Sequence, residues 1–97
     1  MLSNPQKSQL RTLANSLRPL GQIGKDGLND NLLSFLDDAL DSHELIKIRL
    51  LKNCPLSANE VAIEVTRILH SELVQIIGRI LVFYRPAKDD RKIRLVK

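Results

Sequence analysis

Residues 22–30 read QIGKDGLND, and this stretch joins two segments of opposite character. Two glycines, Gly24 and Gly27, enclose a lysine and an aspartate. The residues before the pair form a short candidate strand, whereas the leucines after it recur at the spacing of a helix. Glycine is favoured in turns that require a positive φ. The stretch therefore predicts a strand-to-helix turn, and the remaining elements can be placed on either side of it.

Three segments have the apolar spacing and the terminal residues of helices. Serine, asparagine and aspartate cap helix starts because their side chains accept hydrogen bonds from first-turn amides. A serine followed three residues later by a glutamate is the capping-box pattern. The predicted helices are residues 3–17, capped by Ser3 or Asn4 and ended by Pro19; residues 28–42, capped by Asn29 or Asp30; and residues 57–71, which open with Ser57-x-x-Glu60.

Strand-like patterns fill most of the remaining chain. In HELIKIRLLK (43–52), apolar residues alternate with Lys47 and Arg49, so one face is apolar and the other partly basic. The runs ELVQIIG and RILVFYR meet at a Gly-Arg pair and predict a hairpin with a tight turn. With LGQI before the first glycine of the turn, these runs make four strands. IRLV (93–96) is a further candidate for a short edge strand.

The resulting order is α-β-α-β-α-β-β. Strands that alternate with helices imply parallel pairing with right-handed crossovers, and the terminal hairpin adds an antiparallel pair. A chain of 97 residues leaves no room for two domains. We therefore predict an α/β fold in which a single compact domain, residues 1–97, has a mixed four-stranded sheet and three helices.

The net charge is +4, and basic residues concentrate near the end of the chain. From Tyr84 onward, six lysines and arginines stand against two aspartates. The basic segment, about residues 86–97, is either a solvated terminus or an arm that meets phosphates. No apolar run approaches the roughly 20 residues of a membrane span, and the single cysteine, Cys54, excludes an internal disulfide. We therefore expect a cytoplasmic protein without a membrane partner.

No group of residues indicates catalysis, a metal or a cofactor. His43 and His70 belong to different predicted elements, and HELIK lacks the second histidine of the H-E-x-x-H motif. Cys54 has no neighbouring base in the sequence. The carboxylate pairs at residues 37–38 and 89–90 are adjacent rather than facing, and the glycine segment lacks the flanking residues of a P-loop. We expect no enzyme, no catalytic residue, no metal site and no cofactor.

The glycine pair also fits a loop that nucleic acid touches. Glycines let a sugar-phosphate backbone approach closely, and the amides and dipole at a helix start favour phosphate. Lys25 adds a positive charge at the tip. The G-x-x-G loop of KH domains holds single-stranded RNA by its backbone in this way. Because Asp26 opposes phosphate, we expect it to point away or to contact a base or sugar.

The few aromatic residues do not favour an RRM-type sheet, which stacks bases on exposed rings. Phe35 lies on an apolar helix and Phe83 lies within a strand, so both are predicted in the core. Tyr84, at a strand end beside Arg85, is the one aromatic residue placed at a candidate binding surface.

Three motifs in a fixed order identify a family. LANSLRPLGQIGKDGL, ALDSHELIKIRL and VQIIGRILVFYR together resemble the bacterial YhbY-type protein, the single-domain form of the CRM (chloroplast RNA splicing and ribosome maturation) domain. The resemblance covers roughly residues 5–95. It implies a mixed four-stranded sheet similar to the C-terminal domain of bacterial initiation factor three, and RNA binding through a G-x-x-G loop. Bacterial members associate with precursors of the large ribosomal subunit.

The resemblance also implies contact residues and partners. The partners are RNA, specifically ribosomal RNA of the large-subunit precursor, with ribosomal proteins as further candidates; the protein itself is expected to be a monomer. The implied RNA-binding residues are Gly24, Lys25, Asp26 and Gly27 in the loop, with Lys7, Arg11, Arg18, Lys47, Arg49, Arg79 and Arg85 on a basic surface.

Two positions depart from the family pattern, and two other functions stay open. Asn29 stands where a hydroxyl residue is expected, and His70-Ser71 stands where Gly-Ala is expected. The first alternative function is a protein-interaction module of an assembly complex in which RNA contact is secondary. The second is a small enzyme or nucleotide-binding domain. The favoured hypothesis is an RNA-binding factor in ribosome assembly.

Overall fold

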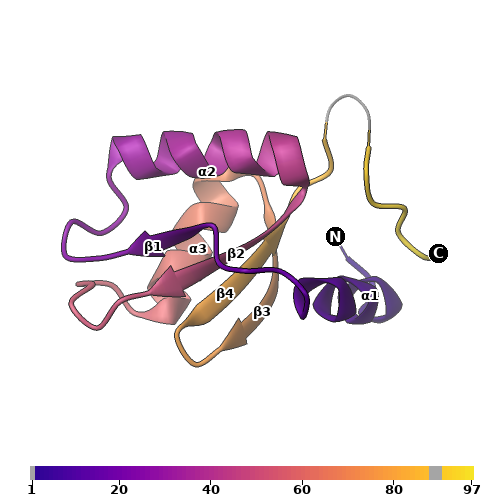
Figure 1. Cartoon of the computed structure of the whole chain (residues 1–97), viewed down its shortest axis with the longest axis horizontal. Coiled ribbons are helices and arrows are strands. Elements are labelled where there is room, and N and C mark those ends of the chain that lie inside the picture. Colours follow the sequence, from indigo (N-terminus) through magenta and orange to yellow (C-terminus); the bar gives the residue numbers. More distant parts are fainter. Residues whose placement is uncertain (1, 88–90) are drawn as a thin grey trace.

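The computed structural model describes residues 2–87 and 91–97, and it confirms the predicted order of elements (Figure 1). The predicted class is also confirmed, since three helices surround one mixed four-stranded sheet. The elements are α1 (Asn4–Ala14), β1 (Gly21–Ile23), α2 (Asp30–His43), β2 (Leu45–Leu50), α3 (Ala58–Leu69), β3 (Glu72–Ile77) and β4 (Ile80–Tyr84).

The strands lie in the order β1-β2-β4-β3. β1 pairs with β2 in parallel, with Gly21 opposite Ile48, and the other two pairs are antiparallel. Because of these directions, three connections meet at one end of the sheet: residues 24–29, residues 51–57 and the turn at residues 78–79 (Figure 1). We call this end the loop end. Both α2 and α3 begin there.

Each face of the sheet has its own core. On one face, α2 and α3 pack against alternate strand residues, including Ile46, Ile48 and Phe83. On the other face, α1 packs against the intervening residues, including Leu45 and Val82. α1 is too short to cover this second face, so the part nearest the loop end carries Lys47 and Arg49 beyond the helix. None of the helices in the described ranges is long and apolar enough to cross a membrane.

The helix caps follow the sequence closely. Ser3 and Ser57 each form a capping box, with Gln6 and Glu60 as the respective third residues. The Asn29 side chain accepts a hydrogen bond from the Leu32 amide at 2.8 Å. The departure from a hydroxyl residue at position 29 therefore leaves the cap of α2 intact.

Several predictions at the edges of elements are wrong. α1 ends at Ala14, before Pro19, and residues 93–96 form no strand within the described ranges. Phe35 is 47% exposed, because its ring lies over Gly21 of the edge strand β1 rather than between the layers. Tyr84 is only 3% exposed, because β4 is an inner strand whose second face is covered by α1. Phe83 is fully buried, as predicted.

Candidate nucleic-acid interface

The two glycines of residues 24–27 have different structural roles. The Gly27 amide donates to the Gly24 carbonyl at 3.0 Å, which closes a turn with Lys25 and Asp26 exposed at its tip. Gly27 has a φ of 61°, a conformation that strains other residues. Gly24 has no positive φ, and an added Cβ there would lie 3.5 Å from Leu51 and 3.6 Å from Asn53. The geometry of the turn therefore explains why position 27 is a glycine, but it does not by itself require a glycine at position 24.

Two hollows lie side by side at the loop end because the segment 51–57 borders both. The first, about 480 Å³, is formed by the glycine turn together with Asn29 and Asn53. The second, about 500 Å³, lies between the segment 51–57 and the hairpin turn, and Lys52 and Arg79 line it. Lys52 is not among the contact residues that the sequence predicted. Its one signal is that it precedes the Asn-Cys-Pro break, which places it on a loop.

Two helix starts add positive electrostatic potential to this end, because α2 and α3 both begin here and a helix N-terminus has a partial positive charge. Some of the first-turn amides of these helices are already hydrogen-bonded, since the Asn29 and Ser57 side chains accept hydrogen bonds from the Leu32 and Glu60 amides. At α3, hydrogen bonds from the backbone and side chain of Ser57 lower the pKa of Glu60 against a small opposing effect of desolvation. Glu60 is therefore a fixed negative charge beside the second hollow.

The uncovered part of the sheet continues from the loop end. Lys47 and Arg49 lie on β2 and line a groove of about 240 Å³ between the end of α1 and the hairpin β3–β4. Ile77, at the end of β3, is 56% exposed and lines the same groove. The groove thus combines two cations with an apolar wall, next to the Arg79 turn.

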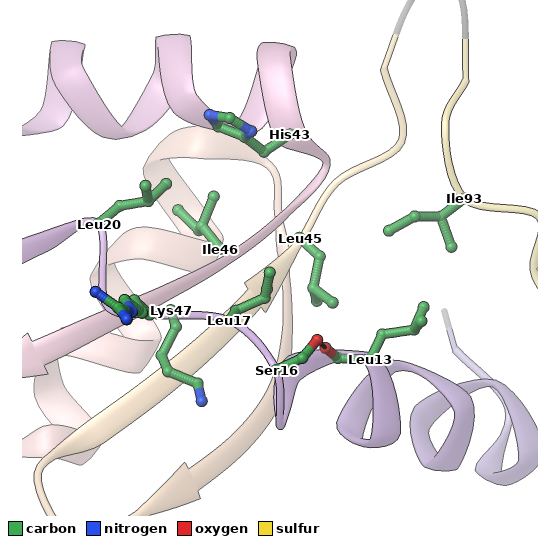
Figure 2. Close-up of a pocket in the computed structure, with 10 residues that line it drawn as sticks. Leu13, Ser16, Leu17, Leu20, His43, Leu45, Ile46, Lys47 and Ile93 are labelled. Carbon is green, nitrogen blue, oxygen red and sulfur yellow. Dashed lines mark hydrogen bonds between the residues drawn. The ribbon is translucent and has the colours of Figure 1, made fainter.

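The remaining predicted cations do not join the loop end. Lys7 and Arg11 lie on α1, which is at the opposite end of the molecule in Figure 1. Arg18 lies between α1 and β1 and lines a separate, mainly apolar pocket of about 420 Å³. Leu13, Leu17 and Leu20 form much of its wall (Figure 2). These predicted RNA-binding cations therefore lie in three regions: the loop end with its adjoining groove, α1, and the apolar pocket.

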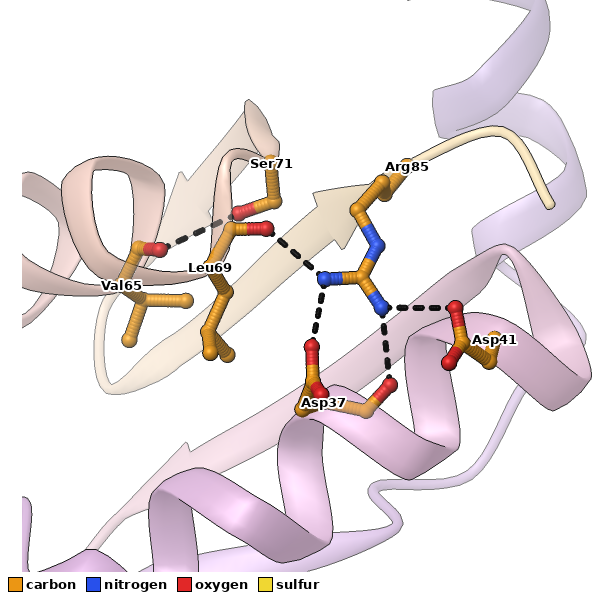
Figure 3. Close-up of polar contacts among 6 residues, drawn as sticks. All are labelled: Asp37, Asp41, Val65, Leu69, Ser71 and Arg85. Carbon is orange, nitrogen blue, oxygen red and sulfur yellow. Dashed lines mark hydrogen bonds and ion pairs between the residues drawn. The ribbon is translucent and has the colours of Figure 1, made fainter. Parts of the chain in front are cut away.

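Arg85 requires a correction. Its guanidinium donates to the side chains of Asp37, at 2.7 Å, and Asp41, at 2.9 Å (Figure 3). It also donates to the main-chain carbonyls of Asp37 and Leu69. The side chain is only 15% exposed. We therefore remove Arg85 from the candidate contacts, because its donors join β4 to α2 and to the end of α3.

Within residues 2–87 and 91–97, no three histidine, cysteine or acidic side chains come together as metal ligands. His43 lines the apolar pocket, and Cys54 lines the second hollow.

Comparison with known proteins identifies the family of this chain. The sequence profile of the CRS1/YhbY (CRM) domain matches residues 2–85. The chain belongs to the CRM-domain family. This CRM domain is 41% identical over 95 residues to the Bacillus subtilis protein named "Probable RNA-binding protein YqeI", covering 98% of this chain and 99% of that one. A Haemophilus influenzae protein named "RNA-binding protein" is 36% identical over 94 residues, covering 97% and 94% respectively.

A solved relative has the same fold. The solution structure of the hypothetical protein SAV1595 from Staphylococcus aureus is 40% identical and superposes with a TM-score of 0.74, covering 99% of this chain and 100% of that one. The family profile ends at Arg85, whereas both the curated relatives and the solved structure extend over nearly all of this chain. The C-terminal segment therefore accompanies the CRM domain in these relatives.

Proposed function

We propose that this protein binds RNA and that the loop end is its principal contact. The observation that carries the proposal is the convergence of three cations, Lys25, Lys52 and Arg79, on two hollows at which two helices begin. Phosphate is the ligand that such a combination of cations and helix N-termini favours. The names of the Bacillus and Haemophilus relatives, which describe RNA-binding proteins, support RNA as the source of that phosphate.

The proposed mechanism is electrostatic and directed at the RNA backbone. Phosphates meet Lys25 at the glycine turn, and Arg79 extends the positive surface toward Lys47 and Arg49 on the open sheet. Exposed Ile77 in the same groove offers a contact for an unpaired base. Asp26 is exposed beside Lys25, so its negative charge limits the number of phosphates that can bind at the tip. Its carboxylate can instead accept a hydrogen bond from a sugar or base.

The finer assignments rest on the resemblance to YhbY-type proteins. We propose that the RNA is ribosomal RNA in precursors of the large subunit, that the protein acts there as a monomeric assembly factor in the cytoplasm, and that it catalyses no reaction. Crosslinking the protein to cellular RNA and mapping the positions tests this assignment. Enrichment of positions outside ribosomal RNA would contradict it.

The loop contact is tested with substitutions that do not strain the turn. Lys25→Gln and Gly24→Ala should each weaken binding to a short single-stranded RNA by about 3- to 10-fold while leaving the melting temperature unchanged. The matched control is Arg67→Gln, which removes the same charge from an exposed site on α3. Gly27→Ala is a poor test because its positive φ makes it destabilising in any case. Wild-type affinity in folded Lys25→Gln would contradict the loop contact.

The protein-interaction alternative has one observation in its favour. The apolar pocket bordered by Leu13, Leu17 and Leu20 has Arg18 and Lys47 at its margin, which suits an apolar segment of a partner that also carries carboxylates. Salt separates the two functions, since phosphate-dominated binding weakens steeply with salt. A nearly flat salt response of the binding to pre-ribosomal particles, together with its loss in Leu17→Ala, would favour the alternative.

A further inference from the structure

The C-terminal segment, residues 91–97, lies against α1 although its composition resembles that of a free basic tail (Figure 1). The Gln9 side chain holds it by two hydrogen bonds of 2.8 Å, donating to the Arg94 carbonyl and accepting from the Val96 amide. Gln6 donates to the Val96 carbonyl at 2.9 Å. Side-chain amides of α1 thus take the place of a neighbouring strand.

Glu44 fixes the start of the same segment. Its buried carboxylate accepts hydrogen bonds from the Lys92 amide at 2.6 Å and the Ile93 amide at 2.8 Å, and its other oxygen accepts from Ala87 at 2.7 Å. Ile93 and Leu95 then pack against the core beneath α1. The segment is therefore ordered by buried contacts rather than by its charges.

This order directs the cations outward. Ile93 and Leu95 face the core, and Lys92 and Arg94, which alternate with them, are exposed. Neither α1 nor residues 91–97 contain an aspartate, a glutamate or an aromatic residue. We call the resulting cluster the tail surface. It consists of the exposed cations of the segment, Arg91, Lys92, Arg94 and Lys97.

The tail surface and the loop end lie at opposite ends of the molecule, whose longest dimension is 39 Å (Figure 1). Exposed cations without aromatic residues suit phosphates of any sequence, and duplex RNA is bound largely through its backbone. We propose that the tail surface is a second RNA-binding site and that one protein molecule bridges two RNA segments. This inference rests on RNA binding at the loop end.

Bridging is measured by energy transfer between two labelled RNA hairpins mixed with the full chain. The wild type should bring the hairpins together, and native mass spectrometry should find one protein with two RNAs. The tail variant Arg91→Gln/Lys92→Gln/Arg94→Gln/Lys97→Gln should keep one RNA and lose energy transfer. If four phosphates of a duplex stem are neutralised, affinity at the tail surface should fall about 150-fold between 50 and 200 mM salt. Lys25→Gln should instead weaken the site at the loop end.

A second variant tests whether the ordered segment matters. Gln9→Ala retains every charge and the cap of α1 but removes two hydrogen bonds to residues 94 and 96, and it should weaken bridging several-fold with single-RNA binding retained. Wild-type bridging in the tail variant would overturn the inference, as would a complex of two proteins with two RNAs. A wild type that binds one RNA only would overturn the inference and leave the proposed function standing. Absence of any RNA binding would overturn both.

Discussion

At the scale of single residues, Arg85 demonstrates that a cation predicted to contact RNA can instead form its hydrogen bonds within the protein. Its guanidinium has four hydrogen bonds to α2 and to the end of α3. We predict that Arg85→Ala lowers the free energy of unfolding by about 1–3 kcal/mol, because carbonyl groups and a partly buried ion pair lose their partner. Urea denaturation at neutral pH measures the change.

Arg67→Ala is the matched control for Arg85. Arg67 pairs with Glu64 on the exposed surface of α3, where side chains are 66% and 40% accessible, so its loss should cost less than about 0.5 kcal/mol. Equal effects of the two substitutions would contradict the structural role of Arg85. The RNA affinity of folded Arg85→Ala should match that of the wild type.

Glu44 gives the fold a specific pH dependence. Burial raises the pKa of its carboxyl group, but hydrogen bonds from the amides of Ala87, Ile93 and Lys92, together with the charge of Arg91, outweigh burial and hold the pKa below its usual value of 4.5. The folded pKa is therefore lower than the unfolded pKa. The stabilisation is fully present above about pH 4.5 and is lost as the pH falls through the folded value.

Substitution of Glu44 tests this dependence. Glu44→Gln should cost about 2–4 kcal/mol at pH 7, because one acceptor oxygen becomes a donor facing a backbone amide. The cost should shrink as the pH falls below about 4.5 toward the folded pKa of Glu44, because the wild type loses this stabilisation and the neutral glutamine does not. Denaturant midpoints of both proteins from pH 3 to pH 7 give the difference. A difference that is constant over this range would contradict a lowered pKa of Glu44 in the folded protein.

These residues also mark the limit of what the sequence could predict. The lysine at the tip of the glycine turn was assigned correctly to an exposed loop, because the signal lies within nine consecutive residues. The aspartate partners of Arg85 and the amide partners of Glu44 lie more than 40 positions away, so no local pattern could show that both side chains are used internally. The charged residues counted in the sequence therefore overestimated the number of side chains available to bind RNA.

At the scale of elements, the end of α3 contains a residue with an unfavourable backbone conformation. His70 caps this helix with a left-handed φ of 52°. Glycine adopts this conformation without steric cost and is common at this position. We predict that His70→Gly stabilises the protein by about 0.5–1 kcal/mol, which raises the melting temperature of a domain this size by roughly 2–8 °C.

His43→Gly provides the comparison for His70. His43 is the last residue of α2, so the same substitution there should destabilise by up to about 1 kcal/mol. Thermal unfolding of both variants gives opposite shifts if the backbone conformation is the cause. A lower melting temperature for His70→Gly would mean that its side chain makes a stabilising contact.

The order of the elements could be predicted because the start of each helix has a local sequence signal. Caps at Ser3, Asn29 and Ser57 and the Gly-Arg hairpin turn are short-range signals, and all of them hold. The exposure of Phe35 and burial of Tyr84 depend instead on strand order, which places β1 at an edge and β4 inside. Likewise, the C-terminal segment pairs with side chains of α1 instead of with a strand, and that contact spans more than 80 residues.

At the scale of the whole molecule, the division of cations between two ends determines how binding responds to salt. Each phosphate neutralised in a single-stranded RNA contributes about 0.7 to the slope of log affinity against log salt. A short oligonucleotide can reach only one end of a protein 39 Å long, so its slope counts the cations at that end alone. The slope is therefore a count of contacts that does not depend on knowing the natural RNA.

We predict that a single-stranded RNA of about five nucleotides, titrated between 50 and 300 mM salt, shows a slope lowered by roughly 0.7 in Lys25→Gln and again in Arg79→Gln. Arg85→Gln should leave the slope unchanged, because that guanidinium is already paired with Asp37 and Asp41. Fluorescence anisotropy measures all three. The three substitutions remove the same charge, so equal slopes in all three variants would mean that net charge alone governs binding. A lower slope in the Lys25 and Arg79 variants only would localise the phosphates at the loop end.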